Sequence, residues 1–407
     1  MSPRSNDSPP AESQAFTLRS LVWSVYIPTF LFSIGQGAVL PVIPLFALDL
    51  GASAAAAGLV VGMRGLGLMF LDLPSGVAVS RFGDKGAMVA GTAIVAIVAV
   101  GAPLTRSVTM LGLLIFFMGG GWSFWQIARL AHLTEVVPVG QRGRALSLVG
   151  GVNRAGNFVG PILGGYLGKY YGLESAFYAQ AVMGIAAAVM MFLVVRTSSG
   201  LEELSGHGIG RRLSATVSEH RRIFLSAGFA VVVLQILRQG RPVFLPLWGN
   251  AIGLDVAEIG LAIGVSSFLD TWLFYPVGHL VDRRGRKWAS IPSLVTMSLG
   301  FLLLPRTTEF IGFALVAVLI GIGNGFGAGI VQVLGADFAP TERRGEFLGV
   351  WRFISDVGVA AGPLAVSAIV GLASLGLASA LSACLGLVGA VVMGALVPET
   401  LQRRPDP

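Results

Sequence analysis

Long apolar stretches, each about as long as one membrane crossing, follow one another along nearly the whole chain. A helix needs roughly 20 apolar residues to cross about 30 Å of hydrocarbon. Short polar segments separate the stretches and hold most of the charged residues. The pattern therefore predicts twelve transmembrane helices, over residues 22–48, 55–78, 87–105, 109–133, 144–167, 174–196, 223–250, 256–280, 288–305, 310–334, 346–370 and 374–397.

Composition agrees with a membrane protein and excludes several other classes. Of the 407 residues, 54% are hydrophobic and only 12% are charged, which is too little charge for the surface of a water-soluble protein. The single cysteine, Cys384, excludes a disulfide framework. The four histidines show no metal-ligand spacing and the sequence has no G-x-x-x-x-G-K-[ST] phosphate loop, so we expect no enzyme activity, cofactor or metal.

The positions of Lys and Arg predict the orientation of the chain. Nineteen of the 28 fall in the tails and loops of one side, six lie within predicted helices, and only Arg106, Lys169 and Arg306 fall on the other side. Positively charged loops stay in the cytoplasm. We therefore expect a multi-pass protein of the cell (inner) membrane with both termini cytoplasmic, a disordered tail at 1–19, a linker at 197–221 and a tail at 398–407. The orientation of the chain in the membrane then accounts for the net charge of +7, and we expect no nucleic-acid partner.

The two halves of the sequence repeat each other at a constant interval of 202 positions. Pro74 maps in this way to Pro276, and Pro161 to Pro363. One register kept over so many helices indicates a duplicated unit. The predicted fold is an all-α membrane protein of two six-helix bundles, residues 20–196 and 222–397, in parallel pseudo-twofold repeat. This architecture suits alternating access around a site at the bilayer midplane.

Two loops at equivalent positions carry related motifs. Residues 76–85 read GVAVSRFGDK and residues 278–287 read GHLVDRRGRK. The second matches a full G-x-x-x-D-R-x-G-R-K pattern, and here the chain resembles the major facilitator superfamily, whose signature loop this is. The first copy differs, with Ser80 where Asp is usual and Asp84 where a basic residue is usual.

The resemblance implies that these loops latch one conformation of the transporter. Glu135 and Asp337, again 202 apart, end the fourth and tenth predicted helices and are the expected partners of Arg81 and Arg283. The predicted latch comprises Gly76, Ser80, Arg81, Gly83 and Glu135 in the first half, and Gly278, Asp282, Arg283, Gly285 and Asp337 in the second.

A run of small residues in the fifth predicted helix points to the direction of transport. Residues 156–165 read GNFVGPILGG, with Gly156, Gly160, Pro161, Gly164 and Gly165 at the motif positions. Small residues spaced by four allow helices to approach closely, and proline permits a bend. The run resembles the antiporter motif of drug:proton exporters, and the number of helices favours their twelve-helix branch. This resemblance implies proton-coupled efflux and multidrug resistance.

Charged residues within the predicted helices are candidates for gating or proton coupling, because burying them in a membrane is costly. By depth along the helices, Asp72 matches Arg352 at about 12 Å from the surface and Asp270 matches Arg154 at about 18 Å. In the fold of the superfamily the helices concerned adjoin across the halves. We therefore predict ion pairs Asp72–Arg352 and Asp270–Arg154. Asp356 has no partner at its depth, which makes it a second candidate for proton exchange.

The fold of the superfamily implies that the first, fourth, seventh and tenth helices line the substrate path. Their candidate binding residues are Gln36, Trp122, Trp125, Gln126, Arg238 and Asn324. The tryptophans suit a flat lipophilic ligand, whereas Arg238 and Arg241 favour an anionic or neutral one. The predicted partners are a small-molecule substrate, protons and the lipid bilayer, with the protein a monomer. The alternative to drug efflux is a gradient-driven facilitator or importer of a sugar or organic anion.

Overall fold

A computed structural model of the protein describes residues 17–195 and 216–401, and within these ranges the chain is helical and contains no strand. Most of the predicted tails (1–19 and 398–407) and linker (197–221) lies outside the described residues. The elements of the first half are η1 (Leu18–Leu21), η2 (Val22–Tyr26), α1 (Ile27–Val39), α2 (Val42–Asp49), α3 (Ala54–Gly101), η3 (Ala102–Leu104), α4 (Val108–Val136), α5 (Val139–Tyr171) and α6 (Glu174–Val194). Those of the second half are α8 (Arg221–Ile223), η4 (Phe224–Gly228), α9 (Phe229–Ala251), α10 (Val256–Arg284), α11 (Lys287–Leu303), η5 (Leu304–Arg306), α12 (Phe310–Phe326), α13 (Ile330–Phe338), α14 (Arg344–Leu372) and α15 (Leu375–Ala395).

Eleven helical segments among the described residues are long and apolar enough to cross a membrane. They match eleven of the twelve predicted stretches. The remaining stretch, 144–167, forms most of the 33-residue helix α5, which is long enough but less apolar because it carries Arg142, Arg144 and Arg154 among many glycines.

The repeat in the sequence is also a repeat in the helices. Helix α4 covers residues 108–136, and α12 and α13 together cover 310–338, which is the same span shifted by 202. The motif glycines Gly83 and Gly285 occupy equivalent turns, with φ of +76° and +109°. Glycine adopts such angles without steric cost. At Gly83 the backbone departs from helical geometry inside α3, so this one element contains both the second and the third predicted helices.

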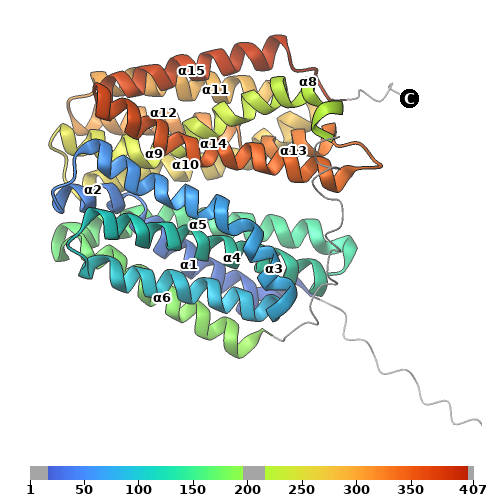
Figure 1. Cartoon of the computed structure of the whole chain (residues 1–407), viewed down its shortest axis with the longest axis horizontal. Coiled ribbons are helices and arrows are strands. Elements are labelled where there is room, and N and C mark those ends of the chain that lie inside the picture. The colour runs from blue at the N-terminus through green and yellow to red at the C-terminus, as the bar shows by residue number, and fades with distance from the viewer. Residues whose placement is uncertain (1–16, 196–215, 402–407) are drawn as a thin grey trace, which may run out of the picture.

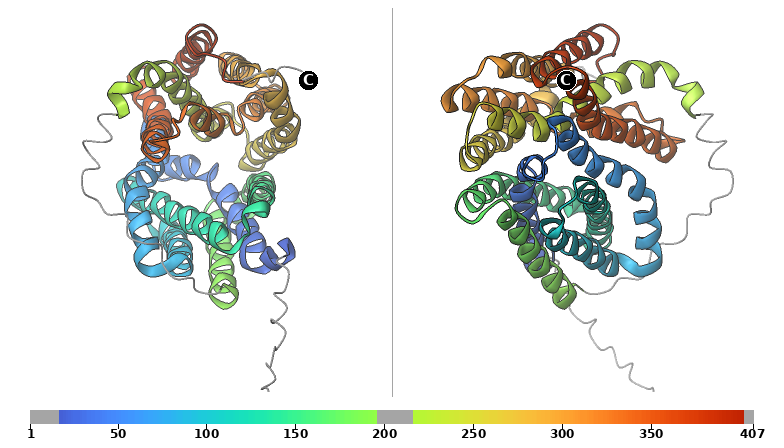
Figure 2. Two further views of the ribbon diagram at one scale, coloured as in Figure 1. Left: turned by 90° about the vertical axis from the view of Figure 1, so that its right-hand side faces the viewer. Right: turned by 60° about the vertical axis from the view of Figure 1, so that its left-hand side comes forward.

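The helices of each half lie together, and the two halves lie side by side (Figures 1 and 2). We name the two ends of the molecule by labels visible in Figure 1. The α2 end holds the connections at residues 50–53, 102–107, 172–173, 252–255, 304–309 and 373–374. The α13 end holds those at 137–138, 285–286 and 339–343, together with the turn at Gly83.

Contacts between the halves are close at the α2 end. A Cβ atom added to Gly165 of α5 would lie 2.6 Å from the Val256 carbonyl oxygen of α10. Between α3 and α14, the Ser367 hydroxyl donates to the Ala55 carbonyl at 2.6 Å. Glycines let the helix backbones approach this closely.

The halves are apart at the α13 end. Eight glycines of α3, α5, α10 and α14 toward that end would meet no atom within 4 Å if they carried a Cβ: Gly76, Gly140, Gly143, Gly150, Gly151, Gly278, Gly345 and Gly349. The described structure is therefore a conformation closed at the α2 end and open at the α13 end.

Candidate functional site

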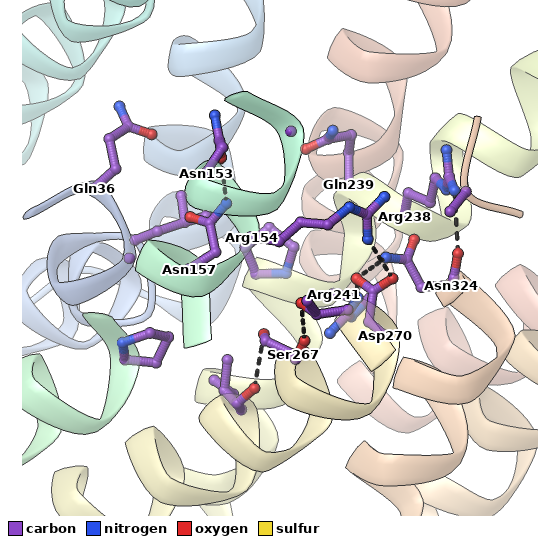
Figure 3. A pocket seen from close by; sticks show the side chains of 18 of the residues that line it. Gln36, Asn153, Arg154, Asn157, Arg238, Gln239, Arg241, Ser267, Asp270 and Asn324 are labelled. Carbon is purple, nitrogen blue, oxygen red and sulfur yellow. Dashed lines mark hydrogen bonds and ion pairs between the residues drawn. The ribbon is translucent and has the colours of Figure 1, made fainter. Parts of the chain in front are cut away.

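A cavity of about 570 Å³ lies between the two halves (Figure 3). Helices α1, α3, α4 and α5 line it from the first half, and α9, α10, α12 and the start of α13 from the second. The polar and charged residues among its lining include the predicted Gln36, Arg154, Arg238, Asp270 and Asn324, together with Arg64, Arg129 and Arg241.

The two predicted tryptophans have different surroundings. Trp122 lines the cavity. Trp125 is fully buried, 4.6 Å from the ring of Phe32, with the guanidinium of Arg129 3.9 Å above its own ring. Neither Trp125 nor Gln126 is among the residues that line the cavity. The two side chains are three residues apart and so lie on nearly the same face of α4, with their rings 5.0 Å from each other, but Trp125 is the one covered by other side chains.

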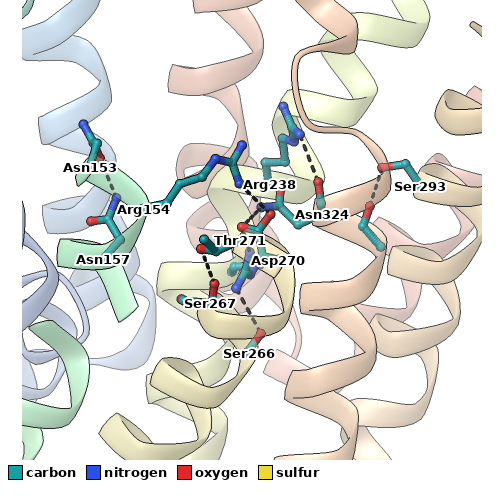
Figure 4. A network of polar contacts seen from close by, with 12 residues as sticks. Asn153, Arg154, Asn157, Arg238, Ser266, Ser267, Asp270, Thr271, Ser293 and Asn324 are labelled. Atoms are coloured by element: carbon teal, nitrogen blue, oxygen red, sulfur yellow. Dashed lines mark hydrogen bonds and ion pairs between the residues drawn. The ribbon is translucent and has the colours of Figure 1, made fainter. Parts of the chain in front are cut away.

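Asp270 is the centre of a network between the halves (Figure 4). Arg154 donates from Nη1 to Asp270 Oδ1 at 3.1 Å, which is the predicted pair. Asn324 donates to the other oxygen, Oδ2, at 2.5 Å. Arg241 Nη1 lies 4.0 Å from Oδ2 and its Nη2 donates to the Ser266 hydroxyl at 3.1 Å. The carboxylate is thus shared among two arginines and an amide.

Asp72 joins the halves between α3 and α14. Arg352 donates to Asp72 Oδ2 from Nε at 3.1 Å and from Nη2 at 2.5 Å, so this predicted pair is also present. The hydroxyl of Ser123 donates to Oδ1. The prediction that Asp356 has no partner is wrong, because its Oδ2 lies 3.7 Å from Arg352 Nε. The two residues are four apart on one helix and therefore neighbours on its surface.

Three of the cavity arginines contact only neutral groups. Arg64 donates to Gln36 Oε1 at 2.7 Å and Arg238 to the Asn324 carbonyl at 3.2 Å. Arg129 stacks on Trp125 and lies 3.4 Å from the Thr29 hydroxyl. Among the described residues, no carboxylate oxygen lies within 4 Å of a nitrogen of these three guanidinium groups.

In the second-half loop, Asp337 pairs with a different arginine from the one predicted. Arg286 Nε lies 2.6 Å from Asp337 Oδ2, whereas Arg283 is exposed. The turn at Gly285 redirects the chain, so the residue after it reaches α13. Thr400 also donates to Asp337, at 2.6 Å.

The first-half loop does not form the predicted pair either. No ion pair joins Arg81 to Glu135 within the part of the chain that the structure describes, and the Arg81 guanidinium lies 5.8 Å from the ring of Phe82. Instead Asp84, the residue equivalent to Arg286, contacts Nδ1 of His132 on α4, and both side chains are buried. The spacing of His132 had suggested no role for it.

The loop after α15 holds the start of α11. Glu399 accepts from the backbone N–H of Arg286 at 2.8 Å and of Lys287 at 3.1 Å. Partial burial acts to raise the pKa of Glu399, but together the backbone donors outweigh it and hold this pKa below its ordinary value. A carboxylate at a helix N-terminus is favourable, so this contact anchors the motif loop.

At the α2 end an ion pair joins the halves. Lys169 of α5 donates to Asp255 Oδ2 at 2.7 Å. Asp255 caps the N-terminus of α10 in a capping box with Glu258. The hydrogen bond from Lys169 lowers the pKa of Asp255, and the same bond raises the pKa of Lys169.

The small-residue run of α5 packs on both sides. A Cβ on Gly160 would lie 2.5 Å from the Ile34 carbonyl oxygen of α1, and one on Gly156 would lie 2.5 Å from the Ser33 side chain. Gly165 faces α10 instead. One helix therefore contacts both its own half and the other half, and it also carries Arg154.

Comparison with known proteins agrees with these features. The sequence model described as Major Facilitator Superfamily matches residues 25–237 and 227–407, which together are most of the chain. The chain belongs to the major facilitator superfamily. This membership confirms the resemblance noted in the loops and identifies a multi-pass membrane transporter.

Relatives within the superfamily include proteins named for drug resistance. The multidrug resistance protein MdtH of Klebsiella pneumoniae (strain 342) is 24% identical over 333 residues, which cover 80% of each chain. The uncharacterized MFS-type transporter MJ1560 of Methanocaldococcus jannaschii is 24% identical over 367 residues, covering 88% of this chain and 94% of the relative. The crystal structure of the nucleoside transporter NupG, with 15% identity, superposes with a TM-score of 0.76 over 94% of this chain and 99% of its own, which shows the shared fold.

Proposed function

We propose that this transporter exports a small lipophilic or drug-like molecule in exchange for protons. The observation that carries the proposal is the position of α5. Its small-residue run, which resembles that of drug:proton antiporters, contacts α1 and α10, and the same helix presents Arg154 to Asp270 at the cavity. The relatedness to MdtH supports export.

Twelve membrane spans are proposed, with α5 as the twelfth and the α13 end in the cytoplasm. The support is the concentration of Lys and Arg at that end. In this orientation the cavity faces the cytoplasm and is ready to receive a molecule for export. Alternating access then requires the α2 end to open and the α13 end to close.

Asp270 is the proposed coupling group. A proton on its carboxylate removes the charge that holds Arg154 of the other half, so protonation weakens a link across the cavity. The Asp72–Arg352–Asp356 cluster is proposed as a second link, nearer the α13 end. In the motif loops, the latch is proposed to act through Arg286–Asp337 and Asp84–His132.

Proton flux in everted membrane vesicles tests this proposal. A pH-sensitive dye reports an interior-acid gradient while neutral, anionic and cationic amphiphiles are added in turn. We expect some of them to dissipate the gradient, and the Asp270→Asn variant to abolish the response. Asp49→Asn, which neutralises an exposed acid at the end of α2, is the matched control and should behave like the unaltered protein. Transport that is the same in Asp270→Asn would refute coupling through this residue.

The second candidate function is uptake or facilitated passage of an organic anion. The specific observation in its favour is the set of arginines that lines the cavity. Substrate movement that ignores the pH gradient in the same vesicles would favour passive passage over proton exchange.

A further inference from the structure

The charge lining the cavity is strongly one-sided. Five arginines line it, and Asp270 is the one acidic residue among the lining residues. The lining thus has a formal surplus of four positive charges: Arg64, Arg129, Arg154, Arg238 and Arg241 against Asp270. Two of the arginines, Arg154 and Arg241, share that single carboxylate.

The other three arginines keep unused hydrogen-bonding capacity. A guanidinium carries five N–H donors. Arg64 and Arg238 each donate one hydrogen bond to a neutral oxygen, and the Nε of Arg238 is buried without any partner. Arg129 is 8% exposed and is held by Trp125 and Thr29. It therefore contributes positive charge to the cavity rather than free hydrogen-bond donors.

Unpaired charges in a low-dielectric space are costly unless a counter-charge joins them. The described part of the chain supplies no second carboxylate to this cavity. Guanidinium groups match carboxylates, sulfonates and phosphates in geometry as well as in charge. A ligand that brings its own negative charge would therefore complete the site.

The other lining residues and the cavity volume indicate the character and size of the rest of the ligand. Trp122, Leu40, Pro161, Pro242, Leu245 and Ile263 provide apolar surface next to the arginines. The ring of Trp122 is stacked 5.5 Å from Phe32, which holds it in place. A cavity of about 570 Å³ is in the size range of drug-sized ligands. We propose that the substrate is an organic anion with one acidic group on a flat, apolar body.

Arginines on both halves take part, which suits a transported ligand. Arg64 and Arg129 belong to α3 and α4, and Arg238 belongs to α9. The acidic group lies nearest Arg64 and Arg238, whose remaining donors are unused, and the apolar body lies against Trp122. This inference rests on the proposed transport function, because it assumes that the cavity is the substrate site.

Binding to the purified protein in neutral phosphatidylcholine nanodiscs tests the inference without any gradient. Isothermal titration calorimetry compares three probes of equal size: 2-naphthoate, 2-naphthamide and 2-naphthylmethylammonium. A hydrogen bond to a charged group contributes about 1.5–3 kcal/mol. We therefore expect 2-naphthoate to bind at least about tenfold more tightly than the neutral amide, and the cation to bind most weakly.

Variants assign the preference to the arginines. Arg64→Gln and Arg238→Gln should each bring the ratio of naphthoate to naphthamide affinity toward one. Arg64→Lys, which keeps the charge, should retain most of the ratio and controls for loss of folding. Arg306→Gln removes an arginine at the α2 end, outside the cavity lining, and should leave the ratio unchanged.

Several results would overturn the inference. They are equal binding of acid and amide, tighter binding of the cation, a preference that survives both Gln variants, or no binding by any anion when the panel is extended to aryl sulfonates and aryl phosphates. Failure of the proposed export would look different. Anion preference in nanodiscs without proton-coupled flux in vesicles would refute export alone, whereas coupled flux restricted to neutral or cationic compounds would refute the anion site alone.

Discussion

Replacing Gly165 by alanine should open the α2 end of the transporter. The new Cβ would lie 2.6 Å from the Val256 carbonyl oxygen and 3.1 Å from the Cα atoms of Ala257 and Gly260, all on α10 of the other half. Ordinary contact begins near 3.4 Å, so the oxygen would be about 0.8 Å too close. Backbone cannot rotate away as a side chain does, and α5 and α10 must therefore separate.

The size of the effect follows from overpacking. Inserting a methyl group into a tight contact costs about 1–3 kcal/mol. That cost falls on the conformation closed at the α2 end, so the ratio of open to closed α2 ends should rise by a factor of about 5 to 150. Gly140→Ala, on the same helix but with no atom within 4 Å, is the matched control and should leave the ratio unchanged. Both variants gain the same helix propensity.

Distances between spin labels measure this ratio. After Cys384→Ser removes the native thiol, labels on Arg106→Cys and Thr308→Cys report the separation of the halves, since both positions are exposed at the α2 end. Pulsed dipolar spectroscopy should show a longer distance population in Gly165→Ala that the control lacks. The reasoning is refuted if Gly165→Ala gains no such population or if Gly140→Ala gains it equally.

Two further results are expected. Gly285→Ala should lower thermal stability by about 1–3 kcal/mol in detergent, because φ is +109° and the Cβ would lie 2.6 Å from the Glu399 carboxylate; Gly345→Ala, in open space, should not. The charge of Asp255 should stabilise the protein fully above its unfolded pKa of about 4, and this stabilisation should be lost as pH falls through its lower folded pKa. The difference in melting temperature between the unaltered protein and Asp255→Asn should therefore be constant near neutral pH and vanish in acid.

Much of the fold could be predicted because the length of the hydrophobic stretches and the 202-residue register are properties of the sequence alone. Depth along a helix follows from residue number, and together with the helix adjacency that the superfamily resemblance implies, it identified the pairs Arg154–Asp270 and Asp72–Arg352. The pairing of Arg352 with Asp356 escaped it because only different helices were compared, and the two lie one turn apart on α14.

Features that depend on backbone direction were harder to predict. Arg286 replaces Arg283 as partner of Asp337 because Gly285 turns the chain between them. Trp122 and Trp125 are indistinguishable as residue types, and the structure was needed to show that Trp125 is fully buried under the guanidinium of Arg129 whereas Trp122 lines the cavity. The sequence placed six basic residues within the predicted helices, but which of them line the cavity, and how few carboxylates they contact, required the structure.

Each of the two motif loops is held to a neighbouring helix by one charged side chain, and the two side chains have opposite charges. Position 84 holds an acid that contacts His132, and the equivalent position 286 holds a base that contacts Asp337. Exchanging one loop residue between the halves would therefore set a guanidinium against an imidazole, or two carboxylates against each other. A chimaera of the halves would therefore need to carry both members of a pair together.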